Sequence, residues 1–145
     1  QNLKGPYAAV IPLFISEIIQ NKSPNVNGNG KTSRDFTFVS NVVQANILAA
    51  TDDRREGHEV FNVAVGDRNT LNNLNSLITS ILASRGFISN KQPEYRDFRG
   101  GDVRHSQASI DKICKVLGYS PKFSLEQGLN DCVDWYIASL KQRVS

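Results

Sequence analysis

Five segments of this chain carry apolar residues at the spacing of an amphipathic helix, and short β-rich segments separate them. The apolar stripes lie within residues 7–21, 41–51, 71–82, 110–117 and 125–141. The predicted strands are a short strand that runs into an Asn-Gly turn within residues 25–30, and residues 35–39 and 59–65. No repeat, low-complexity segment or linker interrupts this alternation. The pattern predicts one domain over residues 1–145, an α/β or α+β lobe of helices with short strands.

The expected helix ends rest on capping chemistry. A serine or threonine hydroxyl accepts a hydrogen bond from a first-turn amide, and glycine adopts the left-handed conformation that closes a last turn. Pro12 is compatible with the first helix only within its first turn. The N-caps expected on this basis are Ser40, Thr70 and Ser124, the last within the capping box 124–127, and the closing glycines are Gly86 and Gly118.

Charge and composition exclude several classes of protein. The net charge of +3, from 17 basic and 14 acidic residues, lacks the clustered basic excess of nucleic-acid-binding domains. No apolar run approaches the roughly 20 residues that a membrane-spanning helix needs. Cys114 and Cys132 lie in separate helical patterns, so we expect half-buried thiols in a reducing cytoplasm. His58 and His105 have no ligand partner at helical spacing, so we expect no metal site.

Two loops, residues 28–36 and 95–106, place arginines beside glycines and small polar residues. The arginine guanidinium is a planar fork of donors that matches phosphate oxygens, and glycine lets the backbone approach a ligand closely. Two such loops can clamp a diphosphate. Composition alone favours the alternative of solvated loops with local ion pairs, each worth about 0–1 kcal/mol. The first loop is not a P-loop, because its spacing is wrong for a Walker motif.

Several blocks along the chain occur in the order found in one enzyme family. They are residues 5–12, 27–36, 41–46, 95–106 and 117–121, together with Trp135-Tyr136. Each block alone is weak, but together they cover essentially the whole chain. On these blocks the chain resembles the C-terminal, substrate-binding part of the extended short-chain dehydrogenases/reductases, the NAD-dependent epimerase/dehydratase family. It is most similar to their UDP-N-acetylglucosamine 4-epimerase group, which serves bacterial polysaccharide pathways.

The resemblance implies a site for a UDP-sugar. Arg34 and Arg99 match arginines that bind the diphosphate, and Phe36 matches a neighbour of the nucleotide. Val10 and Asn27 match contacts to the uridine, made largely through backbone and packing.

The resemblance also implies residues of the sugar pocket and its loop. Asp102 matches a carboxylate that faces the ligand or orders the loop, and an ion pair with Arg104 is an equal alternative. Ala9 and Ser106 match the pocket wall. Relatives restricted to non-acetylated sugars carry a bulky aromatic residue at the position of Ser106, so a serine leaves room for an N-acetyl group. Local departures from the family pattern, outside these residues, occur at Asn29, Lys31 and Gly100.

The catalytic elements of the family do not occur in this sequence. The G-x-x-G-x-x-G turn that holds the pyrophosphate of NAD is absent, and no tyrosine has a lysine at the Y-x-x-x-K spacing. Methionine is absent as well. We therefore expect a fragment of a longer enzyme, with no catalytic, cofactor-binding or metal-binding residues of its own. The resemblance assigns NAD to a Rossmann half that this sequence lacks.

The function expected from this resemblance is binding of UDP-GlcNAc or UDP-GalNAc for a 4-epimerase, without activity of the lobe alone. In the complete enzyme, NAD would take hydride from C4 of the sugar, the 4-keto intermediate would rotate, and hydride would return to the other face. A sibling dehydratase, decarboxylase or reductase remains an alternative. A non-enzymatic truncated module that self-associates through uncovered apolar surface is another. The expected partners are a UDP-sugar and either the missing Rossmann half or a second copy, not nucleic acid or a membrane.

Overall fold

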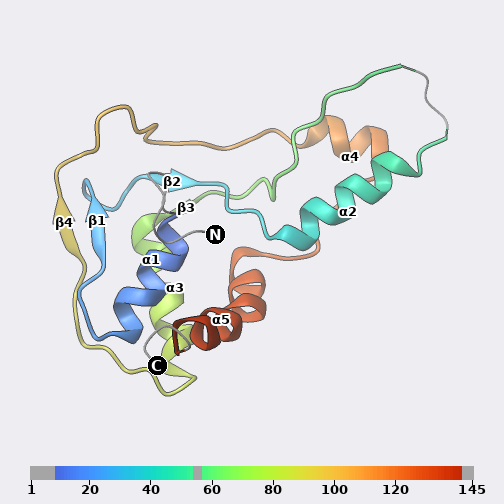
Figure 1. The fold of residues 1–145 in the computed structure, drawn as a ribbon. Helices are drawn as coiled ribbons and strands as arrows, with labels where there is room; N and C mark the ends of the chain where they lie inside the picture. Colours follow the sequence, from blue (N-terminus) through green and yellow to red (C-terminus); the bar gives the residue numbers. More distant parts are fainter. Residues whose placement is uncertain (1–8, 54–56, 142–145) are drawn as a thin grey trace. The chain divides into compact units, whose positions relative to one another are not determined.

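The computed structural model describes residues 9–53 and 57–141 of the chain. The helices, drawn with the strands in Figure 1, are α1 (Val10–Ile19), α2 (Val39–Ala50), α3 (Leu71–Ala83), α4 (Asp111–Leu117) and α5 (Leu125–Lys141). The strands are β1 (Asn25–Asn27), β2 (Ser33–Arg34), β3 (Asn69–Thr70) and β4 (Glu94–Arg96). This mixture of helices and short strands confirms the predicted fold class.

The chain divides into two compact units. Among the described residues, unit 1 comprises 9–32, 70–104 and 129–141, and unit 2 comprises 33–69 and 105–128. Helix α5 begins in unit 2 and continues in unit 1. Each unit has its own set of buried apolar residues.

In unit 1, α1 packs against α3, and β1 runs parallel to β4 (Figure 1). Pro12 lies in the first turn of α1, where its missing N–H leaves no hydrogen bond unmade. The helix predicted over residues 7–21 is thus observed as Val10–Ile19, and residues 7 and 8 lie outside the described part. Each buried Leu, Ile or Phe contributes about 1.5–3 kcal/mol by leaving water. The buried residues of the two helices are Pro12, Phe14, Ile15 and Ile18 in α1 and Leu74, Ile78, Ile81 and Leu82 in α3.

In unit 2, α2 contacts α4 around a small core formed by Ala45, Ile113, Leu117 and Tyr119. Tyr119 is almost fully buried, and its hydroxyl donates a hydrogen bond of 2.9 Å to the carbonyl of Ala64. The phenol therefore adds apolar area to the core while its polar atom remains satisfied.

Most of the predicted helix ends are confirmed. The Thr70 hydroxyl accepts a hydrogen bond of 3.1 Å from a first-turn amide of α3. The capping box before α5 is reciprocal, because Ser124 Oγ accepts from the amide of Gln127 at 3.2 Å and Gln127 Oε1 accepts from the amide of Ser124 at 2.9 Å. Gly118 follows α4 with φ of 67°, and Gly86 follows the end of α3 with φ of 85°.

The N-cap prediction for α2 is wrong. The helix begins at Val39, so Ser40 lies inside its first turn, and Phe38 occupies the N-cap position without a side-chain cap. The ring of Phe38 packs against Phe123, with ring centroids 5.2 Å apart. Packing of an aromatic ring at the N-cap position, rather than a hydroxyl cap, therefore accompanies the start of α2.

Two of the predicted strands are also wrong. Residues 35–38 form no strand, because the carboxylate of Asp35 accepts the amides of Val65 and Gly66 at 3.1 and 3.0 Å in place of a strand ladder. Residues 59–65 have strand-like composition but form no strand in the structure. A β-branched sequence favours an extended chain, but a strand requires a hydrogen-bonded neighbour.

Among the described residues, no helix combines the length and apolar character needed to cross a membrane.

Candidate functional site

In unit 1, the part of the loop 95–106 that follows β4 lies against the turn after β1. The register of the two parallel strands pairs Asn27 with Arg96, and the amide of Gly28 donates to the carbonyl of Arg96 at 2.8 Å. The turn and the loop line a pocket of about 440 Å³. Its lining residues are Gly28, Asn29, Tyr95, Arg96, Asp97 and Phe98.

Gly28 and Phe98 approach each other closely inside this pocket. Gly28 adopts φ of 78°, which glycine tolerates far better than residues with a side chain. A Cβ atom at this position would lie 2.2 Å from Cε1 of Phe98, so the ring occupies the space that any side chain needs. The guanidinium of Arg104 lies 4.4 Å from the centre of the same ring, a cation–π contact. The pocket is thus lined by the rings of Tyr95 and Phe98 beside the buried Gly28, and the Arg104 guanidinium lies over one of these rings.

The predicted site residues of unit 1 come from three segments. Ala9 is the N-cap residue of α1 and Val10 is its first residue, and both are half-buried. Asn27 ends β1 with an exposed side chain. Arg99 and Asp102 lie in the loop after β4, where the amide of Asp102 donates to the carbonyl of Arg99 at 3.2 Å and both side chains are exposed. This turn keeps the guanidinium and the carboxylate within one short segment.

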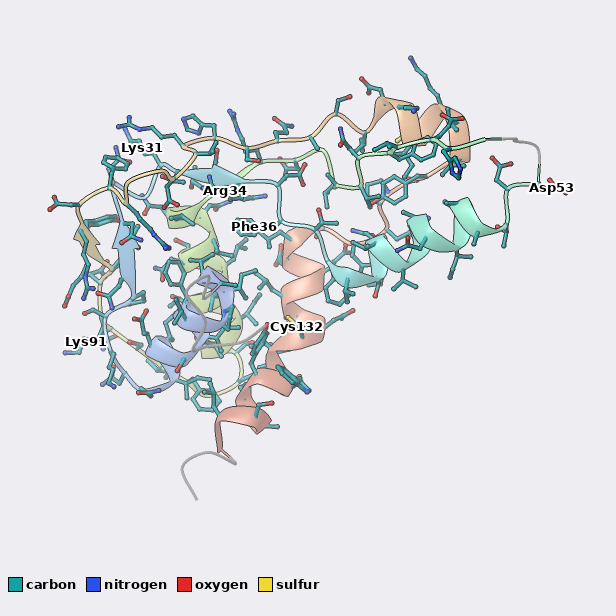
Figure 2. All side chains as sticks on the ribbon, turned by 45° about the horizontal axis from the view of Figure 1, so that its top comes forward. Lys31, Arg34, Phe36, Asp53, Lys91 and Cys132 are labelled. Atoms are coloured by element: carbon teal, nitrogen blue, oxygen red, sulfur yellow. The ribbon has the colours of Figure 1, made fainter. Side chains whose placement is uncertain are left out.

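The predicted site residues of unit 2 are Arg34, Phe36 and Ser106. Arg34 ends β2 and Phe36 follows it in the segment that leads to α2, as labelled in Figure 2. The carbonyl of Ser33 accepts a hydrogen bond of 2.9 Å from Nη1 of Arg34 and one of 3.1 Å from the amide of Ser106. The structure therefore brings Arg34 and the backbone of Ser106 to the same carbonyl oxygen, although they are far apart in the sequence.

The eight predicted residues are divided between the two units, five in unit 1 and three in unit 2. Within each unit the structure places them on a few neighbouring segments. The assignment of these residues to a ligand stays a prediction.

Two contacts, one within each unit, could not be identified from the sequence pattern. The contact of Phe98 with Gly28 depends on strand pairing between residues that are nearly 70 positions apart, as the register Asn27 to Arg96 shows. The hydrogen bond of 2.9 Å between Ser33 Oγ and His105 Nδ1 joins two sequence blocks whose pairing no local signal reveals. A polar loop rich in glycine and arginine was the only indication in the sequence.

Among the described residues, the groups with a shifted pKa lie outside the sequence ranges of the two loops, although Asp35 of the loop 28–36 acts on one of them. Burial raises the pKa of Tyr119, and nearby Cys114 and Asp35 raise it further. Burial is also the main cause of the raised pKa of Cys132, on α5 (Figure 2), and of Tyr136. Over residues 9–53 and 57–141 no cluster of histidine, cysteine and carboxylate side chains has the arrangement of a metal site. The loops carry guanidinium, hydroxyl and aromatic groups that suit anion and ring binding, beside the carboxylates of Asp97 and Asp102 and the imidazole of His105.

Comparison with known proteins shows which family this chain is similar to. Residues 2–132 match the family model of GDP-mannose 4,6 dehydratase. The UDP-N-acetylglucosamine 4-epimerase of Methanobrevibacter ruminantium, solved with UDP-N-acetylmuramic acid, is 38% identical with a TM-score of 0.83, over 96% of this chain and 42% of that one. UDP-glucose 4-epimerase from Thermotoga maritima, solved with UDP-glucose, is 34% identical with a TM-score of 0.82, over 97% and 42%.

A curated relative of another specificity matches to a similar extent. The UDP-N-acetyl-alpha-D-glucosaminuronate decarboxylase of Bacillus cytotoxicus is 31% identical, over 91% of this chain and 41% of the relative. The chain thus spans about two fifths of the length of the proteins that it matches, and it aligns with their C-terminal part. The chain belongs to the GDP-mannose 4,6-dehydratase family of extended short-chain dehydrogenases/reductases.

Proposed function

We propose that this chain binds the UDP-sugar substrate of an NAD-dependent nucleotide-sugar 4-epimerase. The observation that carries the proposal is the carbonyl of Ser33, which accepts both Nη1 of Arg34 and the amide of Ser106. A nucleotide sugar has its diphosphate joined directly to C1 of the sugar. A phosphate-binding guanidinium beside a residue of the sugar pocket matches that covalent order.

An N-acetylated hexose is the sugar that we propose. Ser106 is exposed and small, so it leaves space that an aromatic side chain would fill. The 38% identical UDP-N-acetylglucosamine 4-epimerase, solved with UDP-N-acetylmuramic acid, supports this choice. UDP-GlcNAc and UDP-GalNAc, of the kind that polysaccharide synthesis consumes, are therefore the proposed ligands.

The chemistry of 4-epimerisation requires a hydride carrier and an acid–base group. MoeE5, which is 29% identical to this chain, was solved with UDP-glucuronic acid and NAD. We propose that NAD and the Tyr-Lys pair belong to the part of the relatives that this chain does not match. The residues of this chain anchor the UDP and fix the sugar, so remote binding energy serves positioning, and the chain alone is inactive.

The same lobe occurs in relatives that carry out other reactions. A decarboxylase at 31% identity and the dTDP-glucose 4,6-dehydratase of Shigella flexneri at 29% identity both match over most of this chain. We favour the epimerase because the 38% and 34% identical solved structures are both 4-epimerases.

Calorimetric titration of the chain with UDP-GlcNAc tests the binding proposal. Since the chain spans two fifths of its relatives, we expect weak binding, with Kd of about millimolar. Arg34→Ala and Arg99→Ala should each weaken it about tenfold, whereas Arg68→Ala, an exposed arginine outside both loops, should not. Ser106→Tyr should reduce binding of UDP-GlcNAc more than that of UDP-glucose. A folded chain that releases no heat with either ligand would contradict the proposal.

We also propose that an apolar face of unit 2 docks against the cofactor-binding part of such an enzyme. Val39, Val43 and Ile47 of α2 are 63%, 50% and 58% exposed and recur at helical spacing. Val60, in the strand-like segment 59–65, is 85% exposed. An exposed apolar helix face, and a strand-like segment that lacks a strand partner within the described residues, each suit coverage by a domain built on a β-sheet.

The proposed occupant is a Rossmann-type domain, because about three fifths of each solved epimerase lies outside the match to this chain. Self-association of the chain through the same face is the alternative outcome.

A further inference from the structure

Ser33 is the residue through which the predicted ligand groups of unit 2 are connected. Its side chain is 3% exposed, and its Oγ lies 2.9 Å from Nδ1 of His105. Its carbonyl accepts the hydrogen bonds from Arg34 and Ser106, and the backbones of residues 33 and 105 form a parallel bridge. Ser33 therefore contacts the segment of Ser106 through both its main chain and its side chain.

The residue on the other side of Arg34 is held as well. The Asp35 carboxylate accepts the amides of Val65 and Gly66, and the Gly66 carbonyl accepts a hydrogen bond of 2.7 Å from Nε2 of Gln107. Residue 35 is thus connected to residue 107 through residue 66. Residue 33 is connected directly to residues 105 and 106. Arg34 is thus flanked by two neighbours that are both tied to the segment of Ser106.

We propose that Ser33 and His105 form a positioning pair that fixes the guanidinium of Arg34 and the backbone of Ser106 relative to each other. The proposal rests on the proposed function of these two residues as ligand groups. The hydrogen bond from the Ser106 amide to the Ser33 carbonyl belongs to the bridge between residues 33 and 105, so the main chains of the two segments are joined at this one point. The Ser33–His105 bond adds a second, off-axis restraint, and it lies at an exposed imidazole that contributes little to the core.

Binding of UDP-GlcNAc by variants of the full 145-residue chain tests the pair. Since one hydrogen bond is worth about 0.5–1.5 kcal/mol, His105→Ala and Ser33→Ala should each weaken binding about three- to tenfold. His105→Asn retains a polar atom near the position of Nδ1 and should recover most of the loss. His58→Ala, which removes the other, exposed histidine, is the matched control and should bind as the unsubstituted chain does.

A double-mutant cycle separates positioning from general stability. Arg34→Lys keeps the charge but loses the planar fork, so its binding should be weaker but measurable. If His105 acts through Arg34, His105→Ala should add less than about a twofold loss in the Arg34→Lys background. If the losses of UDP-GlcNAc affinity from His105→Ala and Arg34→Lys multiply independently, the proposal is overturned. It is also overturned if His105→Asn binds UDP-GlcNAc no better than His105→Ala.

A readout without ligand distinguishes failure of this proposal from failure of the proposed function. The Ser106 amide donates to the Ser33 carbonyl, so its hydrogen exchange should accelerate in His105→Ala and return towards normal in His105→Asn. The amide of Cys114 in α4 should not change in either variant. If the chain does not bind UDP-GlcNAc but the Ser106 amide exchanges faster in His105→Ala, only the proposed UDP-sugar binding is rejected. Unchanged exchange at Ser106 would reject the positioning pair even if the chain binds UDP-GlcNAc.

Discussion

Asn41 shows how one polar side chain can organise unit 2. It is fully buried near the start of α2. Its Nδ2 donates to the carbonyl of Phe123 at 2.8 Å, and its Oδ1 accepts the amides of Lys122 and Phe123 at 2.9 and 3.1 Å. Three hydrogen bonds to the chain before α5 satisfy an amide that would otherwise be costly to bury. The asparagine therefore acts as a replacement for a strand or turn pairing between distant segments.

We expect Asn41→Ala to lower the free energy of unfolding by roughly 2–4 kcal/mol, because the carbonyl of Phe123 and the amides of Lys122 and Phe123 lose the side chain that satisfies them. Urea denaturation followed by circular dichroism measures this loss. Asn46→Ala is the matched control in the same helix, since the exposed Asn46 bonds only to the carbonyl of Val42 one turn before it. A loss at residue 41 no greater than that at residue 46 would contradict the role of the buried amide.

Tyr119 gives a prediction about alkaline stability. Burial raises the pKa of its phenol above the ordinary value of 10.0, so the folded protein retains the proton where the unfolded chain has lost it. The contribution to stability is therefore complete below pH 10 and is lost as the pH rises through the folded-state pKa.

Tyr119→Phe should cost about 1–2 kcal/mol at neutral pH, because the carbonyl of Ala64 loses its donor. The difference from the unsubstituted chain should remain constant from about pH 6 to pH 9 and narrow above about pH 10. Urea unfolding at a series of pH values measures it. A difference that stays constant up to about pH 11 would show that the phenol titrates alike in the folded and unfolded chain.

At the scale of elements, the helices followed from the sequence more closely than the strands, of which β1 lies in a predicted strand whereas residues 35–38 and 59–65 form none. A helix is decided by nearby residues, so the caps at Thr70 and Ser124 and the closing glycine 118 were readable in advance. Strand β4 is exposed along its length, so it carries no apolar alternation that could announce it. The site shows the same division. Its residues were named from sequence blocks and their ligand roles stay predictions, whereas the meeting of Ser33 with residues 105 and 106 depends on distant pairing.

Gly128 in α5 is explained by its contact with Phe38, which lies far from it in the sequence, and not by helix propensity. Glycine inside a helix ordinarily costs about 1 kcal/mol relative to alanine. Here a Cβ atom would lie 2.7 Å from both Cβ and Cγ of Phe38. These atoms are near the backbone of residue 38, so they cannot rotate away as a ring edge could. The glycine therefore permits the close packing of Phe38 against α5.

We expect Gly128→Ala to destabilise the chain by about 1–3 kcal/mol, the reverse of the usual effect in a helix, because overpacking exceeds the gain in helix propensity. Gly100→Ala is the control, since its Cβ would meet nothing within 4 Å, and it should change stability by less than about 0.5 kcal/mol. Denaturant titration of both variants gives the comparison. An increase in stability on Gly128→Ala would show that Phe38 moves to make room for the Cβ atom with little loss of free energy, and would contradict the prediction.

At the scale of the molecule, the exposed face of α2 is the feature that the two compact units leave unexplained. On one side of the helix Asn41 and Ala45 are buried in unit 2, whereas Val39, Val43 and Ile47 remain exposed on the other side. Burying three such side chains at an interface would remove about 1.5–3 kcal/mol of unfavourable hydration each. A partner that covers this face should therefore bind the chain and raise its stability by mass action.

Mixing the chain with the separately produced NAD-binding part of the Methanobrevibacter ruminantium epimerase tests this partner, because the two chains are 38% identical where they match. We expect a complex in sedimentation that Val43→Lys and Ile47→Lys each abolish, since a buried unpaired charge is costly. Ile88→Lys, the same substitution at a residue of unit 1 that is 76% exposed, should leave it intact. Association of the chain alone, abolished by the α2 variants, would instead identify a second copy as the occupant. A monomer that never binds the epimerase part, or a complex indifferent to residues 43 and 47, would reject the α2 face as its docking surface.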